Sequence, residues 1–494
     1  MTSTARPLRP IVGVVAFLLC AAGAARARQA APDYGALASQ YRASHGLNDL
    51  PVDQESLGPA LDRGFAALDL GFFDLRYSWN ALADQKRADE WKQMVLAILD
   101  VQARWLQWLD ERDPAPKGAP TPEFATIRQW VTSWKMDAIR KSVASSDAAR
   151  SYLSLAGADE QVVVALKTFA EGMRTGAAAR LKTTGPATQL VLAPTRAEFK
   201  GFAAFAGSLC DDCKALLWTP SLPLRNEFHL DDLVCLALEG PPADGGDAGV
   251  SLSASEKTGL LEHVAQYAAD RLLRHDCGPG IDPALQVGVG VDLVIDLFGQ
   301  NNSRVAGSGE GNKTPERNKF VRGGRSSGGK LPKISADSQW RESRGKDWFV
   351  GALVAAQKEG AKLALKDRPG APGPTAHFIL DCKDFPGEHE LATAPFLGAA
   401  AASKEIPANF FADYQEFLRA YRSCFVHWLA TEAKSKAAGA APRPFARLLR
   451  SCITDAARPF EDRVAEIFGT PLTGATPDGG ALEWQFLAWV SRQK

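Results

Sequence analysis

The hydrophobic positions of the first third of the chain recur mainly at the three- and four-residue spacing of α-helices. The clearest run extends from Trp91 to Trp108, and others cover residues 127–134 and Gln161 to Arg180. The stretch from Leu57 to Leu82 is also apolar at helical spacing. We therefore predict an all-helical N-terminal domain over residues 28–182.

After residue 188 short apolar runs alternate with helical patterns. Strands are expected at Gln189–Ala193 and Leu233–Leu238, each followed by a helix with a capping box. A further helix is expected from Pro283 to Gly299, with Asp292 and Asp296 on its solvent face. This order predicts a small sheet backed by helices over residues 188–299, and a fold class that is α+β but predominantly helical.

The remaining segments complete the expected organisation. Residues 300–347 are rich in glycine and basic, with eleven Lys/Arg against four Asp/Glu between Arg304 and Lys346. We interpret them as a solvated loop, and contact with an acidic surface is the alternative. Helical patterns resume over residues 348–494, which we predict to be a helical C-terminal subdomain.

The N-terminal residues have the layout of a secretory signal peptide. Arg6 and Arg9 precede an apolar run from Ile11 to Ala22, and the small-x-small sequence Ala25–Ala27 follows it. We predict that residues 1–27 are a cleaved signal peptide and that the protein is periplasmic or secreted. A lipid or uncleaved anchor is less favoured, and no later apolar run is long enough for a membrane span in the mature chain.

Charge and cysteine content narrow the function classes. The chain holds 57 basic and 57 acidic residues, so a nucleic-acid binder is not expected. Its eight cysteines are too few for a disulfide scaffold of 494 residues. Cys210 and Cys213 form a C-x-x-C pair, which suits half a metal site, a redox dithiol or a structural disulfide or thiol pair. Export favours the structural role. A disulfide from Cys210 or Cys213 to Cys235 or Cys277 is also conceivable, because the sequence does not determine which cysteines pair.

Several short motifs between Leu190 and the C-terminus occur in a recognisable order. The strand Leu190–Leu192 precedes a helix with paired Phe residues, the strand Leu233–Leu238, a helix over Leu260–Arg274 and the sequence Leu285–Gly288. The tail continues with three further segments: YRSCFVHWL from Tyr421, FEDRVAEIFG from Phe460 and LEWQFLAW from Leu482. In this order the chain resembles the gluzincin-type zinc metallopeptidase domains of bacterial exported proteins, over about residues 188–494. The resemblance implies that Leu233–Leu238 is the edge strand beside the motif helix.

The metal motif of that family is degenerate in this chain. A zinc hydrolase of this kind needs two histidines four residues apart, a Glu after the first histidine and a carboxylate from the next helix. In the alignment that the resemblance implies, His263 stands at the first ligand, Val264 at the general base, Tyr267 at the second histidine and Val287 at the third ligand. One imidazole does not hold zinc tightly, so we expect no catalytic residue, no metal and no cofactor at these positions.

The resemblance and its departures together suggest a function. We expect an exported, non-catalytic relative of a zinc metallopeptidase that acts as a binding or scaffolding protein for an unidentified protein or peptide partner, because edge-strand pairing requires no metal. One alternative is an active exported hydrolase that uses a different set of catalytic residues, such as Glu262 with His263, or a cysteine thiolate. The other is an unrelated secreted helical structural protein.

Overall fold

The computed structural model describes residues 32–112, 121–145, 151–181, 188–219, 222, 227–230, 232–240, 249, 254–277, 283–298, 422–437, 439, 441–455, 457–472 and 480–492. The predicted signal peptide and the basic glycine-rich loop lie outside these residues, and so does the helical pattern directly after that loop. Within the described residues no helix has the length and apolar run that crossing a membrane requires.

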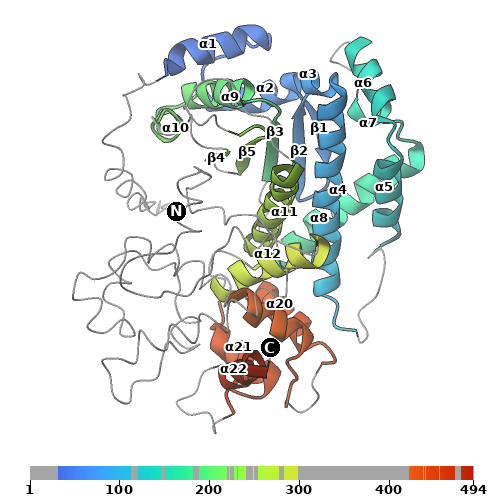
Figure 1. Cartoon of the computed structure of the whole chain (residues 1–494), viewed down its shortest axis with the longest axis vertical. Helices are drawn as coiled ribbons and strands as arrows, with labels where there is room; N and C mark the ends of the chain where they lie inside the picture. The colour runs from blue at the N-terminus through green and yellow to red at the C-terminus, as the bar shows by residue number, and fades with distance from the viewer. Residues whose placement is uncertain are drawn as a thin grey trace, which may run out of the picture.

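Helices make up most of the described structure, and five short strands form one sheet among them (Figure 1). The helices before the third strand are α1 (Tyr34–Ser44), α2 (Leu57–Gly64), α3 (Trp79–Leu82), α4 (Gln85–Trp108), α5 (Pro122–Ser133), α6 (Met136–Ser145), α7 (Tyr152–Leu155) and α8 (Glu160–Leu181), with the short 3-10 helix η1 (Gln54–Ser56) before α2. The later ones are α9 (Arg196–Ser208), α10 (Asp211–Leu217), α11 (Ala254–Cys277), α12 (Pro283–Phe298), α20 (Pro444–Thr454), α21 (Phe460–Phe468) and α22 (Leu482–Arg492). Residues 422–431 are also helical. This composition confirms the predicted α+β, mainly helical fold class.

The sheet is mixed. Its strands are β1 (Phe65–Asp69), β2 (Phe73–Ser78), β3 (Thr188–Ala193), β4 (Glu227–Leu230) and β5 (Leu233–Ala237). They lie in the order β1-β2-β3-β5-β4, with β2, β3 and β5 parallel and the two edge strands antiparallel to their neighbours.

Two expectations about this sheet are wrong. Residues 28–182 are not all-helical, because β1 and β2 lie within the Leu57–Leu82 stretch and pair with the later strands. Apolar residues are so dense there that they fit a helical and an alternating pattern alike, and Gly71 at φ 89° provides the turn between the strands. Leu233–Leu238 is not the edge strand either, because β4 pairs along the outer side of β5.

The two faces of the sheet pack against different helices. Leu190 and Leu192 of β3 join the hydrophobic cluster that includes α4, α11 and α12, whereas Val191 and Ala193 join the cluster of α1 and α9. This division follows from the alternation of side chains along a strand. Helix α4 packs against α11 and α12, while α1 and α10 pack on α9 (Figure 1). The helix α11, which holds His263, therefore lies against the sheet face opposite α9 and α10.

The C-terminal helices add to the hydrophobic cluster on the α11 side of the sheet. Helix α20 packs on α8 and α11, and buried residues of α20, α21 and α22 belong to the same hydrophobic cluster as α11. Asp292 of α12 faces this interior and its Oδ1 lies 3.1 Å from Nδ1 of His427. The expected solvent face for Asp292 is therefore wrong. Asp296, one turn later, is partly exposed and pairs with Arg104 of α4.

Candidate functional site at the edge strand

Polar side chains from β4 and α11 meet at one edge of the sheet. Glu227 and His229 alternate with Phe228 along β4, so both point to the α11 side while Phe228 packs on Phe199 of α9. His263 reaches the same place from α11. The strand and the motif helix thus bring together side chains that are separated by more than 30 residues.

One carboxylate lies between two imidazoles in this group. The Nε2 atom of His263 is 2.8 Å from Oε2 of Glu227, and the Nε2 atom of His229 is 3.5 Å from Oε1 of the same side chain. The side chains of His263 and Glu227 are 20% and 23% exposed. The group is therefore partly shielded from water but open to a ligand. We call Glu227, His229 and His263 the His-Glu-His cluster.

The electrostatics of the cluster favour an ionised carboxylate. Burial alone raises the pKa of Glu227, but hydrogen bonds and electrostatic interactions with His229 and His263 outweigh burial and hold this pKa well below its ordinary value. An ionised carboxylate only accepts hydrogen bonds, so the Nε2 atom of His263 carries the proton of this contact.

Tyr267, which the resemblance would align with the second histidine, belongs to the hydrophobic core. Tyr267 is buried, its hydroxyl accepts a hydrogen bond from Nε of Arg271, and its ring lies 5.6 Å from the His229 ring. Burial raises the pKa of Tyr267 above its ordinary value, and this outweighs the opposing charge of Arg271. A neutral, buried phenol of this kind is a poor ligand for zinc.

The other motif positions do not provide ligands either. Val264 is fully buried among the apolar residues of the core. Val287 lies within α12, and its side chain is outside the described part of the structure. No group of three or more His, Cys, Asp or Glu side chains among the described residues is arranged to hold a metal ion. The residues present here do not fit a zinc ion.

The cysteines lie elsewhere, and their environments differ. Cys210 and Cys213 are joined by a disulfide, whereas Cys235 and Cys277 are buried thiols. Burial raises the pKa of Cys235 and of Cys424 well above the usual value, which is the opposite of what a thiolate nucleophile needs. Glu262, the proposed partner of His263 in the hydrolase alternative, has a fully buried side chain.

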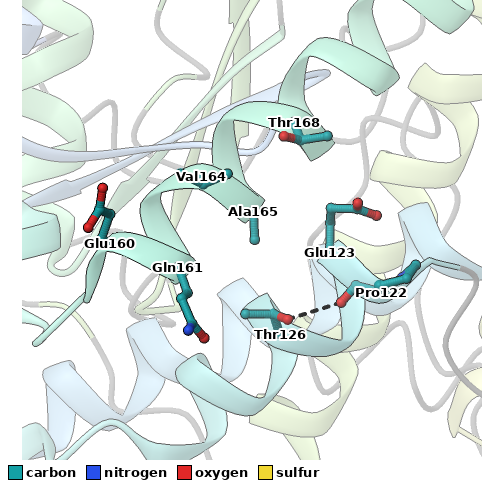
Figure 2. Close-up of a pocket in the computed structure, with 8 residues that line it drawn as sticks. All are labelled: Pro122, Glu123, Thr126, Glu160, Gln161, Val164, Ala165 and Thr168. Atoms are coloured by element: carbon teal, nitrogen blue, oxygen red, sulfur yellow. Dashed lines mark hydrogen bonds between the residues drawn. The ribbon is translucent and has the colours of Figure 1, made fainter.

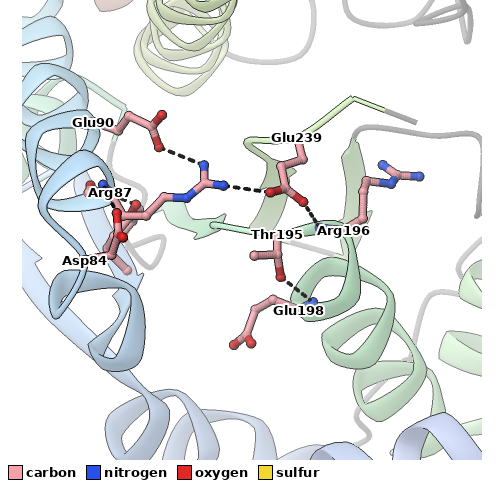
Figure 3. A network of polar contacts seen from close by, with 8 residues as sticks. Asp84, Arg87, Glu90, Thr195, Arg196, Glu198 and Glu239 are labelled. Carbon is pink, nitrogen blue, oxygen red and sulfur yellow. Dashed lines mark hydrogen bonds and ion pairs between the residues drawn. The ribbon is translucent and has the colours of Figure 1, made fainter. Parts of the chain in front are cut away.

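A second polar group lies just after β5 and is centred on Glu239. Glu239 accepts hydrogen bonds from the guanidinium of Arg87 at 2.7 Å and from the backbone N–H of Arg196 at 3.0 Å (Figure 3). Thr195 caps the same helix end by accepting from the N–H of Glu198 at 3.1 Å. Glu239 thus links α4 to the start of α9, so we interpret this group as structural.

A shallow pocket of about 410 Å³ lies between α5 and α8, far along the chain from the cluster (Figure 2). It is lined by Pro122, Glu123, Thr126, Glu160, Gln161, Val164, Ala165 and Thr168. Its polar groups do not converge on a single point in Figure 2, which makes the pocket a weaker candidate than the His-Glu-His cluster.

The sequence pattern indicates one member of the cluster, His263, but not Glu227 or His229. Both of these lie in a polar stretch without a strand pattern, and only pairing of β4 with β5 brings them to α11. Comparisons of the chain with protein-family models, with curated proteins and with solved structures found no match.

Proposed function

We propose that the protein is an exported, non-catalytic relative of zinc metallopeptidases that binds extended peptide segments along β4. The observation that carries this proposal is the contact between Nε2 of His263 and Oε2 of Glu227, at 2.8 Å. With the proton on Nε2, a metal ion would have to displace this proton and break the contact with Glu227. Its partner carboxylate comes from the strand that would lie beside a substrate in an active relative.

The surroundings of the cluster support a binding role over a hydrolytic one. Val264 and Tyr267 are packed into the core at the positions of the base and the second metal ligand. Activation of water by a metal requires several ligands and an open coordination position, which this arrangement does not offer.

The strand β4 offers a way to hold a peptide. It is the edge strand of the sheet, so one of its sides has no neighbouring strand among the described residues. An extended peptide can add to such an edge through main-chain hydrogen bonds. Glu227 and His229 alternate along this strand and would supply polar contacts to the side chains of the added peptide.

A binding experiment with an unfolded polypeptide tests the proposal. Fluorescein-labelled reduced casein is titrated with the full-length protein, with and without added zinc, and hydrogen exchange is followed by mass spectrometry. We expect saturable binding, slower exchange over residues 227–230, unchanged exchange over α5 and no acid-soluble casein fragments.

Two results would contradict the proposal. Fragment release that depends on zinc would support the hydrolase alternative. Binding without protection at β4, or no binding, would exclude the edge-strand mode.

Export is tested separately, by N-terminal sequencing of the protein recovered outside the cytoplasm, with Arg28 expected as the first residue.

A further inference from the structure

The disulfide between Cys210 and Cys213 is not explained by the proposed peptide-binding role. Cys210 immediately precedes α10 and Cys213 lies in its first turn, on the sheet face opposite the His-Glu-His cluster. The bond joins residues three apart, so it ties no two elements of the fold together. The stabilisation expected from closing a loop is smallest for loops this short.

The two sulfur atoms differ in their access to solvent. Cys213 is buried, whereas Cys210 is partly exposed. Thiol–disulfide exchange begins with attack of an external thiolate on an accessible sulfur atom. In this pair the accessible atom is Sγ of Cys210, and Sγ of Cys213 is the leaving group.

Two hydrogen-bond donors contact the pair. The backbone N–H of Cys213 donates to Sγ of Cys210 at 2.9 Å. The side chain of Gln54, from the distant η1, donates to Sγ of Cys210 at 3.5 Å and to Sγ of Cys213 at 3.8 Å. Donors aimed at a sulfur atom stabilise its thiolate and so make it a better leaving group. The exposed carboxylates of Asp211 and Asp212 oppose this effect, but solvent screens them.

Two exposed apolar residues are near neighbours, in sequence, of residues that contact or form the disulfide. Val52, Val164 and Leu216 are the large hydrophobic residues that the described structure leaves at least half exposed. Val52 precedes Gln54 by two residues, and Leu216 follows Cys213 by one turn of α10. These positions make Val52 and Leu216 candidates for an apolar contact with a partner chain that reaches the disulfide.

We propose that the Cys210–Cys213 disulfide oxidises the dithiol of a cysteine-containing peptide segment that docks against Val52 and Leu216. A partner thiolate attacks Sγ of Cys210, the Cys210–Cys213 bond breaks, and Cys213 leaves as a thiolate that takes up a proton. The second partner thiolate then attacks the partner sulfur of the mixed disulfide, and Cys210 leaves and is protonated. The partner gains one disulfide, and this protein gains two thiols.

The test uses the oxidised full-length protein and a reduced synthetic peptide with two cysteines between apolar residues. Disulfide transfer is followed by alkylation and mass spectrometry, under conditions in which circular dichroism shows the protein to be folded. We expect one disulfide transferred per chain. Gln54→Ala should slow the transfer about three- to tenfold, and Gln85→Ala on the exposed start of α4 should leave it unchanged.

Further variants separate docking from chemistry and identify the attacked sulfur atom. Val52→Asp with Leu216→Asp should slow transfer to the peptide but not to dithiothreitol, which needs no docking surface. Cys213→Ser should form a mixed disulfide with the oxidised peptide at least tenfold faster than Cys210→Ser. Peptide thiols that stay reduced while the protein is folded, or equal rates for the two cysteine variants, would overturn the proposal.

Discussion

His263 of the motif helix and Glu227 of the edge strand approach to 2.8 Å between Nε2 and Oε2. This contact joins α11 to β4 and leaves His229 beside the same carboxylate.

Replacing Glu227 by Gln should destabilise the protein near neutral pH. The folded pKa of Glu227 is held below its ordinary value by His229 and His263 against the effect of burial. Ionised Glu227 therefore contributes stability above the ordinary carboxyl range, and this contribution is lost as pH falls through the lowered pKa. Urea unfolding should show E227Q about 1–3 kcal/mol less stable at pH 7.

The pH dependence of that difference is the sharper observation. In strong acid the two proteins should become equally stable, because Glu227 is then protonated in both the folded and the unfolded chain. Glu55→Gln on the exposed η1 serves as the control. A deficit of E227Q that stays constant between pH 7 and strong acid would show that the carboxylate charge is unimportant.

Introducing Glu at position 264 restores part of the family motif but should not restore an enzyme. Val264 is fully buried, so V264E places a carboxylate in the core and should destabilise the protein by more than about 3 kcal/mol. The matched change V164E, at a position 56% exposed on α8, should alter stability by less than about 0.5 kcal/mol. Thermal unfolding of both variants measures the contrast, and equal melting temperatures would place Val264 in a solvated cleft.

His45 should stabilise the protein more in mild acid than in alkali. Burial alone lowers the pKa of His45, but the hydrogen bond and charge of Glu198 and the carbonyl of Tyr41 raise it overall. Stability from a raised pKa is complete below the unfolded value and is lost as pH rises through the folded value. Unfolding experiments should therefore show a deficit of about 2 kcal/mol for H45Q at pH 5.5 and a smaller one at pH 9. A larger deficit at pH 9 would refute this assignment.

Gly71 should not tolerate a side chain. Its φ is 89°, and an added Cβ would lie 2.7 Å from the carbonyl oxygen of Ala170 on α8. Gly71→Ala should cost more than about 2 kcal/mol, because a steric clash adds to the backbone strain. Gly46→Ala, with φ 64° and open space around the Cβ, should cost about 1 kcal/mol. Equal losses measured by urea unfolding would mean that α8 yields to the added methyl group.

The helices were largely predictable from the sequence, and the reason is local. The Trp91–Trp108 pattern corresponds to α4 (Gln85–Trp108), and the capping box at Thr195 begins α9 as expected. Periodicity and caps depend on neighbouring residues, so the sequence alone reveals them.

The strands and the site were less predictable, because they depend on long-range pairing. Phe73, Leu75 and Tyr77 alternate with polar residues in β2, but the same stretch also fits a helix. Glu227 and His229 gain their significance only when β4 pairs with β5 beside α11. A partner for His263 that lies 36 residues away, in a polar stretch, has no local signal.

The most direct test of the central claim is the zinc content of the purified full-length protein. The protein is incubated with excess zinc, desalted and measured by elemental analysis, with Cys210→Ser/Cys213→Ser measured in parallel to exclude binding by those thiols. His263 contacts Glu227, and Val264 and Tyr267 are buried in the hydrophobic core. We therefore predict that the protein binds far less than one zinc ion per chain. Stoichiometric zinc that is lost in His263→Ala would contradict the account.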